Sequence, residues 1–445
     1  MATATTIHLS PSAAALIRIL NITSAAADRV TSLLQTNHSD HHILFDQLGR
    51  HNHIVHHLLA SFSLGADAKT LQKQYDQNVS YQRPPPLADK GVVSSLTDPE
   101  VFESLLGKPE NYTVFLTFFA QELSTSSIPE VVNKIVFADT PIANKLFNLF
   151  FAGYYHPFIH LGYGLEYDQP ALVAEGLAQA CIHSSYLDEF FTATAEASQS
   201  TKPDTLVNLL HAVHGDEKLR NAVKWEDGQK VRDGILARAK DEMIAYAARW
   251  QVPLPPPPAV YFTACAQNPP KVVKFDFFYM HAVTSSLFLS VFLQQDWISD
   301  ASKAKLIEWK GRLDLVLYAS RRSPKLLIDE IRTDVVHLRE WDDMFLQACA
   351  FMDDGHTVKF VRALANDEKV CAPFEGGTVT DSRVNGAETN GVNQDERWQI
   401  KGDMWRRLAG MVLDSVQPKY RDRWLRSVGF EEAWKDCGLR EDFKG

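Results

Sequence analysis

Residues 154–180 read YYHPFIHLGYGLEYDQPALVAEGLAQA, and this stretch carries the strongest indication of the fold. Its second half, with the residues that follow up to Ser184, is rich in Ala, Leu and Glu, which are strong helix formers. Its first half places His156 and His160 in an apolar run that also has a helical pattern. The stretch therefore predicts helices, one of which holds imidazoles among apolar side chains.

Helical patterns recur on both sides of this stretch, whereas strand-like alternation is scarce. Ser10-Pro11 predicts the start of a helix to Leu20, because Ser caps helices and Pro suits their first turn. A second helix is expected from about Asn52 to a stop at Gly65. Further helices are expected at residues 98–106, 112–123, 128–136, 142–151, 207–213, 231–250, 277–293 and 398–416. The sequence thus predicts a mainly α fold.

The composition indicates a globular chain with a large core, because 45% of its 445 residues are hydrophobic and 22% are charged. We expect a single large helical domain over residues 1–445 with a metal site between helices, although two closely packed domains would fit the same composition. Residues 253–258 form a proline-rich break. Residues 376–396 are polar and poor in large apolar side chains, so we expect a mobile loop there.

Charge and cysteine usage exclude several classes of partner. The formal net charge is −10 and the basic residues are dispersed, which argues against nucleic-acid binding. The five cysteines are an odd number without Cys-x-x-Cys spacing, which is typical of an intracellular protein. No secretory signal is evident at the N-terminus, and the apolar stretch 277–293 is too short for a comfortable membrane span. We expect a cytoplasmic protein without a membrane partner.

Four segments far apart in the sequence carry histidines in apolar surroundings. They are HNHIVHH at 51–57, HPFIH at 156–160, FFYMHAVT at 277–284 and DDGHTVK at 353–359. Burying an imidazole without a hydrogen bond or a metal costs roughly 1–3 kcal/mol, so four such placements ask for a common explanation. Imidazole is a suitable ligand for iron, zinc, copper and nickel. The pattern predicts one metal site gathered from four helices.

The last segment adds a lysine to this set. His356 and Lys359 are three residues apart, so on a helix they share one face. An ammonium group would repel a cation, but burial and a nearby cation depress the lysine pKa from its usual value of about 10.4. The neutral amine can then add carbon dioxide and become an anionic carbamate. Four imidazoles and one carbamate would fill five positions of an octahedral ion and leave one for dioxygen, water or substrate.

Five runs of the sequence resemble the questin oxidase-like proteins. They are HHILFDQLGRHNHIVHHLLASFSLGA at 41–66, YQRP at 81–84, the whole stretch at 154–180 quoted first, FYMHAVTSS at 278–286 and DDGHTVKFVRAL at 353–364. The resemblance extends over roughly residues 37–416. It implies a mononuclear non-haem iron, Fe(2+), held by four histidines and a carboxylated lysine, which uses dioxygen to open the ring of an anthraquinone-type polyketide in fungal secondary metabolism. Carried over to this sequence, the implied ligands are His53, His156, His281, His356 and carboxylated Lys359.

Each assignment has a structural alternative. A single histidine on an apolar helix is more often a hydrogen-bonded core residue than a ligand, and His41, His42 and His51 stay in that class. For His356 and Lys359 the alternative is a helix start capped by Asp353 or Asp354, with an exposed lysine. The remaining histidines of the motifs, expected to face substrate or to lie behind the ligands, are His56, His57 and His160. Carboxylates that would accept a ring proton of a ligand are expected among Glu166, Asp276, Asp353 and Asp354.

The hypothesis favoured by these residues is an iron dioxygenase whose product resembles that of a Baeyer–Villiger oxidation followed by hydrolysis. An NADPH-dependent Baeyer–Villiger monooxygenase is the second hypothesis, but it would normally carry a Gly-x-Gly-x-x-Gly turn. Gly162-Tyr163-Gly164 lacks the third glycine, so NADPH, if needed, would serve a partner reductase. A third hypothesis is a non-catalytic helical scaffold with a structural zinc and no open ligand position.

Overall fold

The computed structural model describes residues 1–445 except 253–258, 334–336, 376–398, 418–422 and 441–445. Within the described ranges, regular structure is helical and β-pairing is limited to isolated bridges such as that between Leu44 and His51. The prediction of a mainly α fold is therefore confirmed. The expected proline-rich break at 253–258 and mobile loop at 376–396 lie outside the described residues.

Contacts along the chain divide it into two compact units. Unit 1 comprises Met1–Asp188, Leu287–Lys303 and Phe345–Arg362, and unit 2 comprises Glu189–Ser286, Ala304–Met344 and Ala363–Gly445. Among the described helices, five contribute residues to both units: α11 (Asp188–Ser198), α16 (Phe277–Leu293), α17 (Asp300–Ser320), α19 (Trp341–Cys349) and α20 (His356–Cys371). The prediction of one domain over the whole chain stays a prediction.

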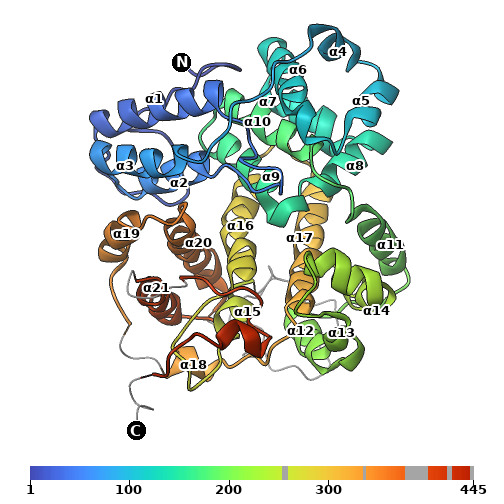
Figure 1. Ribbon diagram of the computed structural model, residues 1–445, viewed down its shortest axis with the longest axis vertical. Coiled ribbons are helices and arrows are strands. Elements are labelled where there is room, and N and C mark those ends of the chain that lie inside the picture. Colours follow the sequence, from blue (N-terminus) through green and yellow to red (C-terminus); the bar gives the residue numbers. More distant parts are fainter. Residues whose placement is uncertain (253–258, 334–336, 376–398, 418–422, 441–445) are drawn as a thin grey trace. The chain divides into compact units, whose positions relative to one another are not determined.

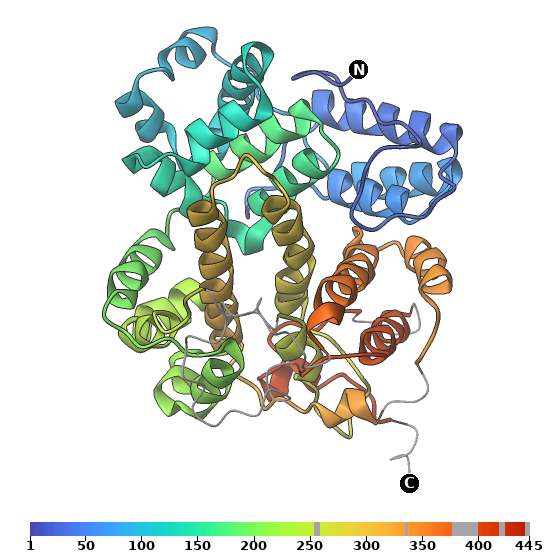
Figure 2. The ribbon, with the colours of Figure 1, turned by 180° about the vertical axis from the view of Figure 1, so that it is seen from behind.

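Unit 1 is built around two groups of helices that can be followed in Figure 1 and, from behind, in Figure 2. Helices α1, α2 and α3 pack against one another, and α9 and α6 both pack against α10. Contact between α2 and α9 joins the two groups. The helices of unit 1 are α1 (Ser24–Asp40), α2 (Ile54–Ser63), α3 (Ala68–Val79), α4 (Lys90–Ser95), α5 (Pro99–Leu105), α6 (Tyr112–Thr125), α7 (Ile128–Val132), α8 (Pro141–Leu149), α9 (Ala152–Glu166) and α10 (Pro170–Cys181), with a short 3-10 helix at Pro109–Asn111 and a short π-helix at Asn133–Phe137.

Unit 2 contains a group formed by α12, α13 and α14, and α18 packs against both α15 and α21. The bounds of its helices are α11 (Asp188–Ser198, whose first residue is assigned to unit 1), α12 (Leu206–Gly215), α13 (Glu217–Ala222), α14 (Lys240–Ala247), α15 (Ala259–Cys265), α18 (Asp329–Arg332) and α21 (Met404–Ser415), with short helical segments at Lys230–Leu236, Ala372–Phe374 and Glu431–Trp434. Among the described residues, no helix has both the length and the apolar character needed to cross a membrane.

The predicted helix at residues 10–20 is wrong, and the first helix is α1. Tertiary hydrogen bonds hold this segment in a non-helical path: Leu16 N donates to Glu166 Oε1 at 2.9 Å, and Ile19 N donates to Ser63 O at 2.9 Å. The Ser-Pro start signal is local, so it could not anticipate these distant acceptors. Helix α1 instead begins after Thr23, whose side chain accepts a hydrogen bond from Ala26 N.

Other predicted helices are confirmed with shifted ends. Helix α2 starts at Ile54 and is followed by Gly65, whose φ of +92° is the left-handed conformation expected of a glycine stop. The buried helix expected at 277–293 is α16, with the same bounds. The helix expected at 231–250 is broken, because the chain turns at Ala239, where φ is −147°, between a π-helical segment at Lys230–Leu236 and α14. Periodicity identified the helical character here but not the interruption.

Candidate metal centre

His53 lies at the N-cap position of α2, and the residue before it fixes this helix start. The Asn52 side-chain oxygen accepts a hydrogen bond from Ile54 N at 2.9 Å, while its amide donates to Asn37 Oδ1 at 2.8 Å. Both Asn52 and His53 are buried. In the Asn-His pair, the asparagine therefore caps the start of α2, and the imidazole of the next residue is held in the interior of unit 1.

His156 follows a left-handed turn that precedes the regular part of α9. Gly153, Tyr154 and Tyr155 have φ values of +54°, +58° and +66°, which is unusual for the two tyrosines. His156 Nδ1 donates to Gly153 O at 2.5 Å, so in the neutral ring the lone pair is on Nε2. Backbone strain of this kind persists where the surrounding structure enforces it. Here the strained turn orients the imidazole of His156.

Gly153→Ala is expected to lower the free energy of unfolding by about 2–4 kcal/mol, from left-handed strain and from overpacking. A Cβ at this position would lie 2.5 Å from His183 Nε2 and 2.9 Å from His51 Cε1. Gly402→Ala is the matched control, because φ there is +58° and a Cβ would meet nothing within 4 Å. Urea denaturation of the metal-free protein measures both. Equal losses in the two variants would show that the histidines exert no steric demand on Gly153.

His356 is presented by the same local arrangement at the start of α20. Asp354 and Gly355 have φ values of +56° and +74°, and His356 Nδ1 donates to Asp353 O, three residues back, at 2.6 Å. A Cβ on Gly355 would lie 2.7 Å from His57 Cα, so only glycine fits. In both α9 and α20, a left-handed turn is thus followed by an imidazole whose Nδ1 proton is held by a carbonyl.

Three of the predicted ligands come together in unit 1. His53 Nε2 lies 2.9 Å from His156 Nε2, and the rings of His53 and His356 are 4.9 Å apart between centroids. Two nitrogens at right angles around an ion, each about 2.1 Å from it, would be about 3.0 Å apart. Since His156 Nε2 carries a lone pair, either tautomer of His53 leaves its buried Nδ1 without a hydrogen-bond partner among the described residues. These residues therefore fit a metal ion.

Lys359 is buried with this cluster, at 5% exposure. Burial lowers its pKa to about 8, against the opposite effect of the carboxylates of Asp353 and Asp354. The charge of Lys359 in turn contributes, after burial, to a pKa of His53 well below the usual range. The exposed lysine of the alternative reading is thus wrong, although its capping aspartate is present: Asp353 Oδ2 accepts from Thr357 N at 3.0 Å.

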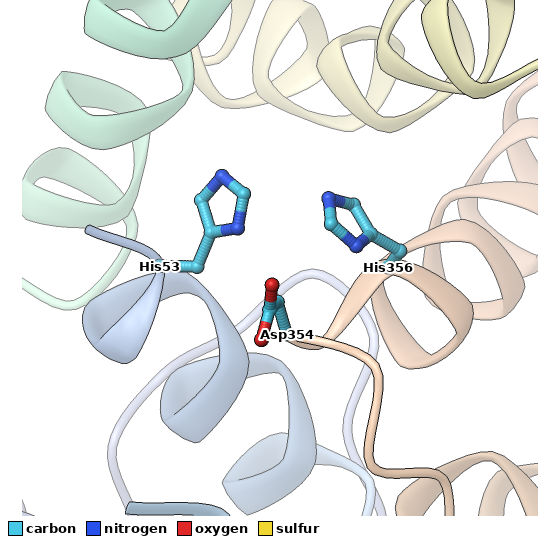
Figure 3. Close-up of side chains that lie close together, drawn as sticks. All are labelled: His53, Asp354 and His356. Carbon is cyan, nitrogen blue, oxygen red and sulfur yellow. The ribbon is translucent and has the colours of Figure 1, made fainter. Parts of the chain in front are cut away.

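Asp354 is a further candidate ligand. His53, Asp354 and His356 each offer one ligand atom, and these atoms lie within 4.8 Å of one another. Figure 3 shows the two imidazoles facing each other with the carboxylate to one side between them. The Tyr81 hydroxyl, from the YQRP run, donates to Asp354 Oδ1 at 2.8 Å. Asp354 can therefore bind a cation directly or accept a proton beside it.

His281 lies in unit 2, in the first part of α16. It is 2% exposed, and its Nδ1 donates to Phe277 O at 2.8 Å, so the lone pair of the neutral ring is on Nε2. His156, His356 and His281 thus share one feature, a backbone carbonyl that holds the Nδ1 proton. This arrangement is common for histidines that bind metals through Nε2. The role of His281 as a ligand stays a prediction.

The remaining motif histidines have hydrogen-bond partners in unit 1. His56 Nε2 lies 3.1 Å from His160 Nδ1, and His57 Nδ1 accepts from the Asn78 amide at 3.1 Å. His51 was expected to be an ordinary core residue. Its ring stacks on His156 at 3.7 Å between centroids, and its Nε2 lies 2.8 Å from His183 Nε2. His51 therefore supports a predicted ligand.

Two of the four carboxylates expected to hold ring protons have other partners. Glu166 pairs with Arg362 at 2.5 Å, and Asp276 accepts from the backbone of Phe278 and Tyr279 at the start of α16. Glu175 accepts a hydrogen bond from the motif histidine His160 and another from His38. The sequence did not indicate a role for Glu175, His38 or His183. A single acidic residue inside the apolar helix at residues 171–181 was the available signal for Glu175.

Comparison with known proteins shows a match along nearly the whole chain. Residues 50–364 match the sequence profile of the family described as questin oxidase-like. The chain is 38% identical over 449 residues to the Baeyer-Villiger oxidase ptaJ of Pestalotiopsis fici, covering 97% of this chain and 98% of that protein. It is 38% identical over 458 residues to a questin oxidase of Aspergillus fumigatus, covering 98% and 99%. The Baeyer-Villiger monooxygenase dmxR6 of Cryptosporiopsis sp. is 37% identical over 453 residues.

These relatives all have the names of oxidising enzymes, which assigns the chain to the oxidoreductases. The profile match covers the segments of His53, His156, His281, His356 and Lys359. With a shared profile over more than half of its length and relatives of this identity, the chain belongs to the questin oxidase-like family.

Proposed function

We propose that this protein is a non-haem iron-dependent dioxygenase that cleaves a carbon–carbon bond of an anthraquinone-type aromatic polyketide in fungal secondary metabolism. The observation that carries the proposal is the buried cluster of His53, His156, His356 and Lys359, in which the neutral imidazoles of His156 and His356 present Nε2 lone pairs. The names of the fungal relatives support the substrate class and the ring-opening reaction.

Each residue of the cluster has a distinct task in this proposal. His53, His156 and His356 would hold Fe(2+), with His281 as the predicted fourth imidazole and Lys359, as a carbamate, as the anionic ligand. Bound iron would supply activation of dioxygen and stabilisation of negative charge. The carbonyls of Gly153 and Asp353 keep the imidazoles of His156 and His356 in the tautomer with the lone pair on Nε2. Burial of all these side chains excludes water from the reacting groups.

The lysine fits its task because burial already favours the neutral amine. A pKa of about 8 leaves a substantial neutral fraction at neutral pH, whereas an ordinary lysine near 10.4 would leave almost none. Only the neutral amine can attack carbon dioxide, and the product is an anionic oxygen donor. A negative ligand also offsets the charge of an ion that is otherwise surrounded by neutral imidazoles.

The names of two relatives also favour a second candidate, a Baeyer–Villiger monooxygenase, which we would expect to depend on NADPH. The sequence that came nearest to a nucleotide-binding turn, Gly162-Tyr163-Gly164, lies inside α9. There a Cβ on Gly162 would lie 2.4 Å from Phe288, and one on Gly164 would lie 2.7 Å from Val173 N. These glycines permit close helix packing, so NADPH would act through a partner reductase that prepares the substrate.

Metal analysis with labelled oxygen tests the proposal. The purified protein is expected to hold about one iron per chain and to place label from 18O2 into a cleaved product when it is offered a panel of anthraquinones and their reduced forms. Stoichiometric zinc without oxygen consumption would support the scaffold reading instead. Oxygen consumption that requires NADPH in the absence of any partner protein would support the monooxygenase.

His281→Ala is expected to lose most of the bound iron and the activity, because one donor would be removed from a preformed site. The loss of metal affinity should exceed the ~10–100-fold effect of removing a group that only orients a ligand. Iron per chain after anaerobic reconstitution is the measurement. His211→Ala, an exposed histidine of the same unit, is the control and should keep its iron. Full iron occupancy in the His281 variant would remove this residue from the ligand set.

A further inference from the structure

A row of four hydrogen-bonded side chains runs from His38, which is partly exposed, to the histidine cluster of unit 1. His38 Nδ1 lies 2.6 Å from Glu175 Oε1, and Glu175 Oε2 lies 2.7 Å from His160 Nε2. His160 Nδ1 lies 3.1 Å from His56 Nε2. The centroid of the His56 ring is 6.0 Å from the ring centroids of both His53 and His156. The exposed fraction of the side chain falls along the row, from 10% at His38 to 2% at Glu175 and 0% at His160.

The pattern of protons along this row follows from the acceptors. The Glu175 carboxylate can only accept, so His38 donates its Nδ1 proton and His160 donates its Nε2 proton. His160 Nδ1 then has a lone pair in the neutral ring, and His56 donates to it through Nε2. This leaves a lone pair on His56 Nδ1, a buried atom that has no hydrogen-bond partner among the described residues. The row therefore ends inside the unit on an open acceptor.

We propose that His56, His160, Glu175 and His38 form a proton wire between the buried histidine cluster and solvent, and that it takes up the proton of a substrate hydroxyl. The inference rests on the proposed function, because a phenolic or hydroquinone-like substrate must lose such a proton as its ring becomes electron-rich. The wire gives a role in proton transfer to His56 and His160, which are not among the predicted ligands. It gives the same role to Glu175, to which the sequence assigned no function.

The transfer balances without any change in oxidation state. The substrate hydroxyl gives its proton to His56 Nδ1, His56 passes its Nε2 proton to His160 Nδ1, and His160 passes its Nε2 proton to Glu175 Oε2. At the outer end, protonated His38 releases its Nε2 proton to water. The ion pair of Glu175 and His38 thereby becomes a neutral pair, and a phenolate remains beside the cluster. The reverse sequence restores the wire and delivers a proton inward.

The pKa values along the row favour proton transfer outward from His56 to the pair of Glu175 and His38. Burial disfavours the charged form of His56 and lowers its pKa well below the usual range, so the imidazolium form of His56 is short-lived. Burial alone would raise the pKa of Glu175, but hydrogen bonds from His160 and His38 lower it to about 2. For His38 the same carboxylate outweighs burial and raises the pKa. The outer pair therefore holds separated charges that an incoming proton can neutralise.

NMR spectroscopy of the histidine ring protons in the metal-free protein tests the proton wire in the absence of substrate and iron. In the full chain labelled with 15N-histidine, we expect His160 and His56 to carry their protons on Nε2, and Glu175→Gln to shift both resonances. His41→Ala, a histidine directly after the helix that carries His38, should leave them unchanged. A proton on Nδ1 of His160 in the wild-type protein would overturn the proposal, because the carboxylate would then have no proton to receive.

Turnover of the iron-loaded enzyme tests the transfer itself, with reduced 1,8-dihydroxyanthraquinone as the probe. In weak buffer, His38→Ala is expected to lower kcat about tenfold or more with little change in KM, and added imidazole should restore it. His41→Ala should match the wild type and show no dependence on imidazole. A His38 variant with wild-type kcat, or one that imidazole does not rescue, would reject the wire. If the wild-type holoenzyme itself shows no turnover, the proposed function fails, and the ring-proton spectrum alone decides the wire.

Discussion

Lys359→Ala is expected to strip most of the iron from the protein and to abolish measurable oxygen consumption with substrate. The physical reason is the loss of the anionic ligand that the proposal assigns to Lys359, a position where burial has already lowered the lysine pKa to about 8. The effect should exceed the ~10–100-fold loss of metal affinity seen when a group that merely orients a ligand is removed. Iron per chain and the rate of dioxygen uptake measure it.

The control lies on the same helix. Lys369 is exposed near the end of α20, so Lys369→Ala should retain wild-type iron and turnover. Small carboxylates such as acetate can occupy the space left by the Lys359 side chain, and partial rescue by them would identify the missing group as an anionic oxygen donor. Full iron and full turnover in Lys359→Ala would end the carbamate proposal while leaving the histidine site intact.

Arg362→Met should produce the largest loss of stability, about 3–5 kcal/mol in the free energy of unfolding. Arg362 Nη2 and Glu166 Oε1 are 2.5 Å apart, and their side chains are 1% and 2% exposed. Removing the guanidinium would leave a carboxylate buried without its cation. The pair joins the end of α9, which begins near His156, to α20, which begins at His356, so iron affinity should fall with stability.

Two comparisons identify the cause of that loss. Glu166→Gln added to Arg362→Met should recover much of the stability, because no unpaired charge would then be buried. Arg50→Met breaks an exposed ion pair with Asp46, in which the arginine side chain is 62% exposed. The free energy of unfolding should fall only by the ~0–1 kcal/mol typical of exposed pairs. Urea denaturation of the metal-free variants measures all three. A single variant within about 1 kcal/mol of wild type would contradict the prediction.

Most helices could be predicted from the sequence because their signals are local. Helix α10 is marked by Ala, Leu and Glu, α2 by the stop at Gly65, and α16 by an unbroken apolar run. The exception at residues 10–20 shows the limit of such signals. There the Ser-Pro start motif is overridden by backbone hydrogen bonds from Leu16 and Ile19 to oxygens of Glu166 and Ser63, which lie far away in the sequence.

The candidate ligands were found through motif resemblance, whereas the groups that support them were not. Backbone carbonyls hold the Nδ1 protons of His156 and His356, although carboxylates were expected in that role. Carbonyl oxygens leave no mark in a sequence, because every residue has one. Glu175 was missed for a related reason, since its partners His38 and His160 lie 137 and 15 residues away along the chain.

The sequence by itself determined that the chain is mainly helical, because helix propensity and apolar periodicity act within a few turns. It also determined which residue types were available to bind a metal. Only the tertiary structure decided which imidazoles meet. His53 and His156 are 103 residues apart in the sequence, and their nitrogens lie 2.9 Å from each other because α2 packs against α9. Side-chain packing between distant helices sets such distances, and no local pattern encodes it.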